Sequence, residues 1–128
     1  MKTKYIVALS AVAGVAIGGA AIETLHAQAT APVYSVAIIQ ISDNDAYRKE
    51  FAPLARDSIK MHGGTFVAAG TATPLDGDMP KGRMVILRFD SMDALYAWRK
   101  APDRQAAWKV GEKYAKFNIA AVPGVKAQ

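Results

Sequence analysis

The 128-residue sequence contains no cysteine. This absence excludes disulfide scaffolds, thiolate zinc sites, iron–sulfur clusters, cysteine nucleophiles and lipid anchors attached through cysteine. Histidine is scarce, with two residues, and no phosphate-binding glycine fingerprint, nucleophile elbow or zinc-protease motif occurs. We therefore expect neither a metal ion nor a cofactor.

The sequence also lacks a continuous stretch of charged residues of one sign. Basic residues outnumber acidic ones by 16 to 11, which gives a formal net charge of +5. They alternate with acids, as in Arg48-Lys49-Glu50 and Asp103-Arg104, instead of forming a stripe, so no nucleic-acid partner is expected. With 52% hydrophobic residues, the chain has the composition of one globular domain.

A single long apolar run, Ile6–Ile22, follows the basic start of the chain. Small residues then occupy both ends of Ala27-Gln28-Ala29. This layout is typical of a secretory signal peptide, residues 1–29, cleaved after Ala29. An uncleaved membrane anchor is the alternative, because the run reaches the lower limit of a spanning helix. Both interpretations predict a periplasmic or secreted domain, and cleavage would leave no membrane contact.

After a linker at residues 30–32, the pattern predicts one domain over residues 33–124 and a tail at 125–128. Apolar runs and alternation predict strands over 33–41, 65–71, 83–89 and 117–122. The first helix is expected to begin at Ser42, in a capping box with Asp45, and to kink near Phe51 because of Pro53. A second helix is expected to begin at Ser91 and to continue through Pro102.

The order strand, helix, strand, strand, helix, strand predicts an α+β fold, the ferredoxin-like βαββαβ arrangement. Two helical regions would cover one face of an antiparallel four-stranded sheet. Both alternating sets of the strand at 33–41 are largely apolar, so the second face needs a cover as well. A second copy of the sheet would supply it, which predicts a homodimer through the open sheet face, a dimeric α/β barrel.

Three stretches, 61–70, 82–91 and 97–105, resemble domain-of-unknown-function family 1330 (DUF1330) of the dimeric α/β barrel superfamily. The likeness spans Tyr34 to Val122 and includes Gly63-Gly64, Trp98, and Pro102 with Gln105. Arg83, Phe89 and Ser91 also follow the family's habits. The resemblance implies the fold and the dimer, and it implies no established reaction.

Three positions depart from that family. Arg88 stands where an acidic residue is usual, Asp90 replaces a customary proline, and Arg99 replaces a tyrosine after the tryptophan. The export signal also differs from the usual cytoplasmic member. Any family function that depends on the missing carboxylate or tyrosine does not carry over to this chain.

Arg88 and His62 are the candidate site residues that stand out from the pattern. Arg88 alternates with Met84 and Ile86, so its guanidinium needs an anionic partner or a route to water. Pairing with a carboxylate near the strand end is one interpretation, and binding a small carboxylate or phosphate together with Arg83 is the other. His62 follows the first helix, where it would cap the C-terminus or serve a nearby pocket as ligand contact or general base.

Asp76 and Asp78 resemble the start of a calcium loop but lack its other ligands, so turn formation is the favoured interpretation. The favoured function is a homodimer that binds a small organic or anionic molecule between helices and sheet. The alternative is a cofactor-independent oxygenase or isomerase, with His62, Tyr34 or Asp57 moving the proton. A purely structural interaction partner is a third hypothesis.

Overall fold

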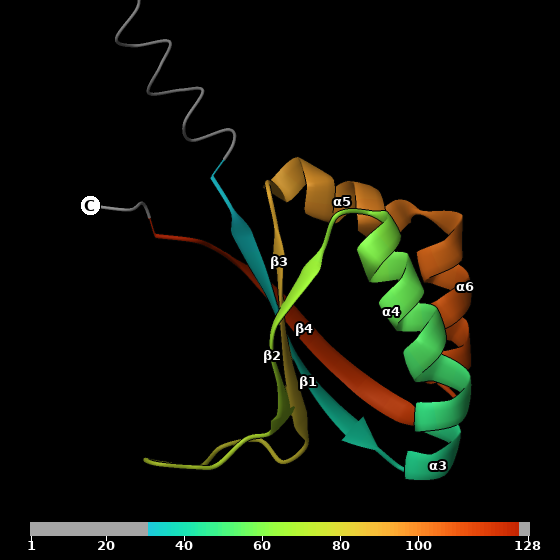
Figure 1. Cartoon of the computed structure of the whole chain (residues 1–128). Coiled ribbons are helices and arrows are strands. Elements are labelled where there is room, and N and C mark those ends of the chain that lie inside the picture. Colours follow the sequence, from blue (N-terminus) through green and yellow to red (C-terminus); the bar gives the residue numbers. More distant parts are fainter. Residues whose placement is uncertain (1–30, 126–128) are drawn as a thin grey trace, which may run out of the picture. The chain divides into compact units, whose positions relative to one another are not determined.

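The computed structural model describes residues 31–125. The predicted signal peptide at residues 1–29 and part of the predicted tail lie outside the described residues. Four strands form one sheet: β1 (Val33–Ile41), β2 (Thr65–Thr71), β3 (Arg83–Phe89) and β4 (Ala115–Pro123). The helices α3 (Asn44–Ala46), η1 (Tyr47–Phe51), α4 (Ala52–Met61), α5 (Met92–Lys100) and α6 (Pro102–Gly111) all lie on one side of it (Figure 1). This arrangement confirms the α+β ferredoxin-like prediction.

The sheet has the strand order β2-β3-β1-β4, and every neighbouring pair is antiparallel. β1 is central, and its Ala37 lies opposite Val85 on β3 and opposite Ile119 on β4. β2 is an edge strand with a bulge between Phe66 and Ala68. None of its residues is buried, because the helix layer covers β1 and β3 more fully than this edge. One side of the space beneath the helices therefore stays accessible.

The first helical region differs from the prediction at its start. Asp43, not Ser42, is the N-cap, and its carboxylate accepts a hydrogen bond from the Ala46 amide at 3.1 Å. Ser42 instead donates its hydroxyl to the carbonyl of Tyr114 at 3.0 Å. Both Ser42 and Asp43 suit a cap, and the contact of Ser42 with Tyr114, in the turn between α6 and β4, leaves the cap to Asp43.

The predicted break near Phe51 takes the form of the π-helical turn η1. Within it the Ala52 amide donates to the carbonyl of Tyr47, five residues earlier. Pro53 lacks an N–H, so a regular α-helix would leave one carbonyl of this turn without its donor. The wider turn ends where Pro53 takes its place in the first turn of α4.

The second helical region is two helices and not the continuous one expected. Ser91 caps α5 as predicted and accepts a hydrogen bond from the Ala94 amide at 3.1 Å. Ala101 is extended, with φ −64° and ψ 139°. A residue before proline is pushed out of the helical region, so Pro102 begins α6 instead of prolonging α5. The last strand is also longer than predicted, running from Ala115 to Pro123.

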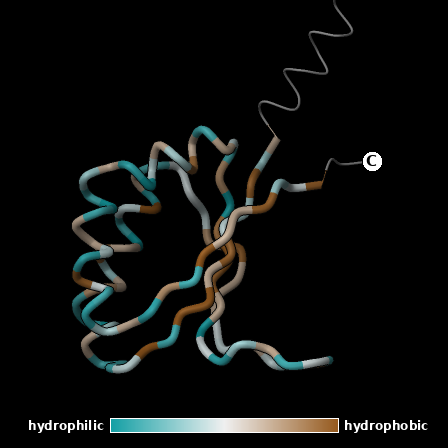
Figure 2. Tube along the Cα trace, turned by 180° about the vertical axis from the view of Figure 1, so that it is seen from behind, coloured by the Kyte–Doolittle hydropathy of each residue, from teal (hydrophilic) through white to brown (hydrophobic). Residues whose placement is uncertain are grey.

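The core lies between the helices and one face of the sheet, and Trp98, Phe89 and Val33 are its most deeply buried large side chains. Figure 2 shows hydrophobic residues gathered along the strands and hydrophilic ones along the helices. The opposite sheet face carries the alternate residues of β1 and β3, which are half-buried: Tyr34, Val36, Ile38, Met84, Ile86 and Arg88. None of the helices within residues 31–125 has the length and hydrophobicity needed to cross a membrane.

Candidate functional site

A cavity of about 350 Å³ lies between the sheet and the helical stretch η1–α4. It exists because small side chains face one another there: Ser35 and Ala37 on β1, and Ala52 and Ala55 on α4. In a well-packed layer, larger residues at these positions would fill the space. The cavity opens between exposed side chains, Arg48, Arg56, Phe66 and Arg83 among them, which we call the rim.

The interior of the cavity is aromatic and aliphatic. Phe51, which is 2% exposed, packs edge-on against Trp108 with ring centroids 5.0 Å apart. Phe117 lies 5.4 Å from Phe51 and 5.9 Å from Trp108. These three rings form what we call the aromatic wall, and Ile39, Val85 and Leu87 of the sheet lie opposite the helices.

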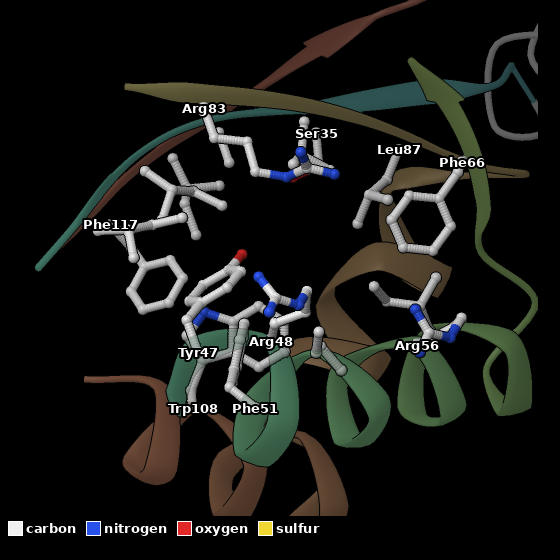
Figure 3. Close-up of a pocket in the computed structure, with 18 of the residues that line it drawn as sticks. Ser35, Tyr47, Arg48, Phe51, Arg56, Phe66, Arg83, Leu87, Trp108 and Phe117 are labelled. Atoms are coloured by element: carbon white, nitrogen blue, oxygen red, sulfur yellow. The ribbon is translucent and has the colours of Figure 1, made fainter. Parts of the chain in front are cut away.

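Among the described residues that line the cavity, arginine is the only charged type: there are three arginines and no Asp, Glu, Lys or His. Arg83 extends from the sheet toward Ser35, while Arg48 and the hydroxyl of Tyr47 extend toward it from the helix (Figure 3). Arg56 lies farther along, beside Phe66. Burial raises the pKa of Tyr47 above its ordinary value, and the positive charge of Arg83 opposes that rise.

The arginines of the rim differ in their partners. Arg48 donates to Asp45 at 3.0 Å in an exposed i,i+3 pair. Within residues 31–125, no carboxylate lies within ion-pair distance of Arg56 or Arg83. Two guanidinium groups at the rim are therefore left for water or a ligand.

A fourth arginine supports the aromatic wall from outside the cavity. Arg104 is buried, with its guanidinium 4.1 Å from the ring centroid of Trp108 and 5.2 Å from that of Trp98. Burial, with a smaller contribution from Arg99, lowers the pKa of Arg104 to about 10, while Glu112 acts in the opposite direction. The group remains a cation at neutral pH and is held by stacking on the two indoles.

Of the candidate residues taken from the sequence, Arg83 alone lines the cavity. His62 lies at the end of α4, where its Nε2 is 3.0 Å from Oδ1 of Asp103 on α6. That carboxylate also accepts the hydroxyl of Ser58 at 2.5 Å, and Ser58 in turn accepts the indole N–H of Trp98 at 3.1 Å. His62 thus belongs to a network that joins the helices to one another.

The other candidates lie outside the cavity as well. Tyr34 and Arg88 are opposite each other on the open face of the sheet, and Arg88 donates to Asp90 at 2.9 Å. This is the carboxylate near the strand end that one interpretation of Arg88 required. Asp57 is exposed on α4, at a shallow groove between α4 and α6. The structure therefore brings Tyr34 and Arg88 together and leaves His62 and Asp57 apart from them.

The sequence reasoning missed Tyr47, Arg48 and Arg56 as cavity residues. Tyr47 and Arg56 belong to no motif, and Arg48 stands in a stretch of mixed charge that is typical of a solvent-exposed surface. The signal that was available is Ser35, a polar residue in the buried set of β1, on the same sheet face as Arg83. Residues 31–125 contain no group of three or more His, Cys, Asp or Glu side chains placed to hold a metal ion.

A four-stranded antiparallel sheet with helices on one face and a cavity beneath them defines an α+β protein with the ferredoxin-like fold. The chain belongs to DUF1330, a family of domains of unknown function, whose sequence profile matches residues 32–125. The resemblance read from the sequence is thereby confirmed. No curated protein matches the sequence.

Solved structures share the fold at low sequence identity. The methylated form of a Rhodopseudomonas palustris protein of unknown function has a TM-score of 0.64 and 12% identity, over 84% of this chain and 91% of that one. A cofactor-independent oxygenase from Streptomyces nogalater, SnoaB, has a TM-score of 0.58 and 13% identity, over 76% and 96%. A dimeric protein of unknown function with a ferredoxin-like fold from Bacteroides fragilis has a TM-score of 0.52 and 10% identity, over 73% and 96%.

Proposed function

We propose that this protein is an exported homodimer that binds a small organic molecule in the cavity between sheet and helices. The observation that carries the proposal is the cavity itself, a concave space with a buried apolar interior and a few polar groups at the rim. Ligand sites in proteins have this composition and volumes of about 300–1,000 Å³. A cavity of about 350 Å³ suits a small ligand.

The groups that line the cavity favour binding over proton-transfer catalysis. In the part of the chain that the structure describes, no carboxylate or imidazole lines the cavity, and an arginine is too basic to exchange protons near neutral pH. Burial raises the pKa of Tyr47, so its phenol stays protonated near neutral pH and no phenolate is available to act as a base. A bound molecule would therefore be held and oriented by this lining.

The homodimer is proposed from the open face of the sheet. Its Val36, Ile38 and Ile86 are apolar, and no helix within residues 31–125 covers them. A second copy would cover that face without any other partner. The similar protein from Bacteroides fragilis is described as dimeric. Export to the periplasm or the medium is proposed from the signal-peptide pattern of residues 1–29.

Native mass spectrometry of the full-length gene product, recovered from an exporting bacterial host, tests all three parts at once. We expect two copies of residues 30–128 with an additional small mass that denaturation releases. A native mass that corresponds to a single chain contradicts the homodimer. A chain mass that still includes residues 1–29 contradicts cleavage. Ligand-free protein that also fails to bind any member of a small-molecule library contradicts the binding function.

The alternative function is a cofactor-independent oxygenase or isomerase acting on a small organic substrate. It is favoured by the shared fold with the Streptomyces nogalater enzyme and by Tyr47, which brings a phenolic proton to the cavity. The test is turnover of a bound molecule, measured by the mass of the product and by dioxygen uptake. If this function holds, the wild-type protein turns the molecule over and Tyr47→Phe does not. Bound ligand that is returned unchanged supports the binding protein instead.

A further inference from the structure

We infer that the cavity selects organic anions: an apolar, preferably aromatic body against the aromatic wall and a carboxylate at the rim. This inference deepens the binding function proposed above and depends on it. The reasons lie in the charge of the lining, in the arrangement of the arginines and in the chemistry of guanidinium groups.

The lining has charge of one sign only. Arg48, Arg56 and Arg83 come from η1, α4 and β3, and the lining residues within 31–125 include no acidic side chain. Arg48 pairs with Asp45 outside the lining, so Arg56 and Arg83 carry the charge that no carboxylate of this described part balances. Arg104 adds a further cation behind Trp108. Like charges that converge on a weakly polar space repel one another, and an anion placed between them relieves that repulsion.

The positions of the arginines suit a carboxylate at one end of the cavity. Arg83 extends from the sheet, and Arg48 and the Tyr47 hydroxyl extend from the helix toward the same space (Figure 3). Guanidinium groups bind carboxylates with two parallel hydrogen bonds, and a neutral phenol donates a third. Because Arg83 has no carboxylate partner within residues 31–125, binding a ligand there breaks no ion pair of the protein.

The rest of the cavity suits an apolar body attached to that carboxylate. Phe51, Trp108 and Phe117 present ring faces and edges to the interior, and aliphatic residues of the sheet lie across from them. Aromatic rings pair favourably with such walls at centroid distances of about 4.5–7 Å. A bare phosphate or sulfate would leave this part of the cavity unused.

Isothermal titration calorimetry with matched probes tests the inference on the purified protein. The probes are 2-naphthoate, its neutral analogue naphthalene-2-carboxamide, and inorganic phosphate. We expect 2-naphthoate to bind at least about tenfold more tightly than the carboxamide, since hydrogen bonds to a charged group are the stronger ones. Inorganic phosphate is expected to bind weakly and not to displace 2-naphthoate.

Two pairs of variants locate the site. Arg83→Gln and Arg48→Gln are expected to weaken 2-naphthoate binding by about tenfold or more each, with little change for the carboxamide. The matched controls are Lys81→Gln and Lys49→Gln, which remove one positive charge from exposed residues near the same arginines but outside the lining. Unchanged melting temperatures establish that all four variants are folded, and Arg83→Lys is expected to recover part of the affinity.

The outcomes separate this inference from the function on which it depends. Equal affinity for 2-naphthoate and the carboxamide overturns the selectivity for anions and leaves the binding function standing. If the lysine controls lose as much affinity for 2-naphthoate as the arginine variants, the selectivity for anions in the cavity is also overturned. The net positive charge of the protein would then explain the binding. If inorganic phosphate binds as tightly as 2-naphthoate, the cavity does not require an apolar body on its ligand, and that part of the inference is wrong. Failure of both naphthalene probes to bind overturns the inference, whereas the binding function is contradicted only if the protein also binds no member of the small-molecule library.

Discussion

At the scale of single residues, the carboxylate of Asp103 joins the ends of two helices. It accepts hydrogen bonds from Ser58 and lies within hydrogen-bond distance of His62, while Trp98 donates to Ser58 from α5. The hydrogen bond from Ser58, followed by that from His62, lowers the pKa of Asp103 below its ordinary value of 3.8. Both partners stabilise the charged form of the carboxyl group.

The substitution Asp103→Asn is expected to reduce the acid sensitivity of folding. A carboxyl whose pKa is lower in the folded state stabilises the protein above its unfolded pKa, and this contribution is lost as pH falls through the folded value. The wild type should therefore lose stability below about pH 3.8, and Asp103→Asn should show a smaller decline over the same range while being less stable at pH 7. Thermal melting from pH 2 to pH 7 measures both effects.

Asp57→Asn is the control for this experiment, because Asp57 is an exposed acid on α4 next to Ser58. It should follow the wild-type pH profile. If the decline in Asp103→Asn matches that of the wild type, the carboxylate does not stabilise the fold through its charge.

Arg83 and His62 show which parts of the site can be predicted from the sequence and which cannot. Alternation along β3 placed Arg83 on the face of Val85 and Leu87, which is where the cavity lies. The partner of His62, in contrast, is 41 residues away and on another helix, so no local pattern pointed to it. Side-chain partners across a core depend on how elements pack, which strand and helix periodicity does not specify.

At the scale of elements, strand and helix positions were predicted well because they depend on local rules. Strands β1, β2 and β3 have the predicted bounds, and the break near Phe51 follows from the missing N–H of Pro53. The last strand is longer at both ends than predicted. The two differences in the helical regions concern choices between equally good local options. Ser42 and Asp43 both suit a cap, and a proline such as Pro102 begins a new helix as readily as it joins the first turn of a longer one.

The connection from α4 to β2 offers a test of packing at this scale. Gly64 lies where an added Cβ would approach Phe89 to 2.7 Å and Ile59 to 2.8 Å, and both of those side chains are buried. Gly64→Ala is therefore expected to lower the free energy of unfolding by about 1–3 kcal/mol through overpacking. Urea denaturation followed by tryptophan fluorescence measures this loss.

The double variant Gly64→Ala/Phe89→Leu distinguishes overpacking from a backbone effect. Because leucine is smaller than phenylalanine, it leaves room for the new methyl group. The loss in the double variant should be smaller than the sum of the two single losses by about 1 kcal/mol. Additive losses would show that the cost at Gly64 does not come from the Phe89 ring.

At the scale of the whole molecule, the two faces of the sheet explain both proposals. The face toward the helices carries the core and, where small residues meet, the cavity. The opposite face carries Val36, Ile38 and Ile86, and a monomer would leave these side chains in contact with water. This two-faced pattern was visible in the sequence, whereas the volume and the charge of the cavity depend on packing and were not.

The homodimer can be tested without disturbing the cavity, because the two faces are separate. Ile86 is half-buried on the open face, opposite Val36 on β1, and its neighbours Val85 and Leu87 point to the core. Ile86→Asp would place a charge in an apolar interface between two sheets, where it has no partner, at a cost of several kcal/mol. We expect the wild type to sediment as a dimer and Ile86→Asp as a folded monomer in analytical ultracentrifugation.

Leu54→Asp provides the matched control, since Leu54 is an exposed apolar residue on α4, on the helix side of the protein. It introduces the same charge far from the open face and should leave the dimer intact. A wild type that sediments as a monomer, or an Ile86→Asp variant that remains dimeric, would place the subunit contact elsewhere or remove it. Retention of 2-naphthoate binding by a monomeric Ile86→Asp protein would further establish that one chain alone completes the cavity.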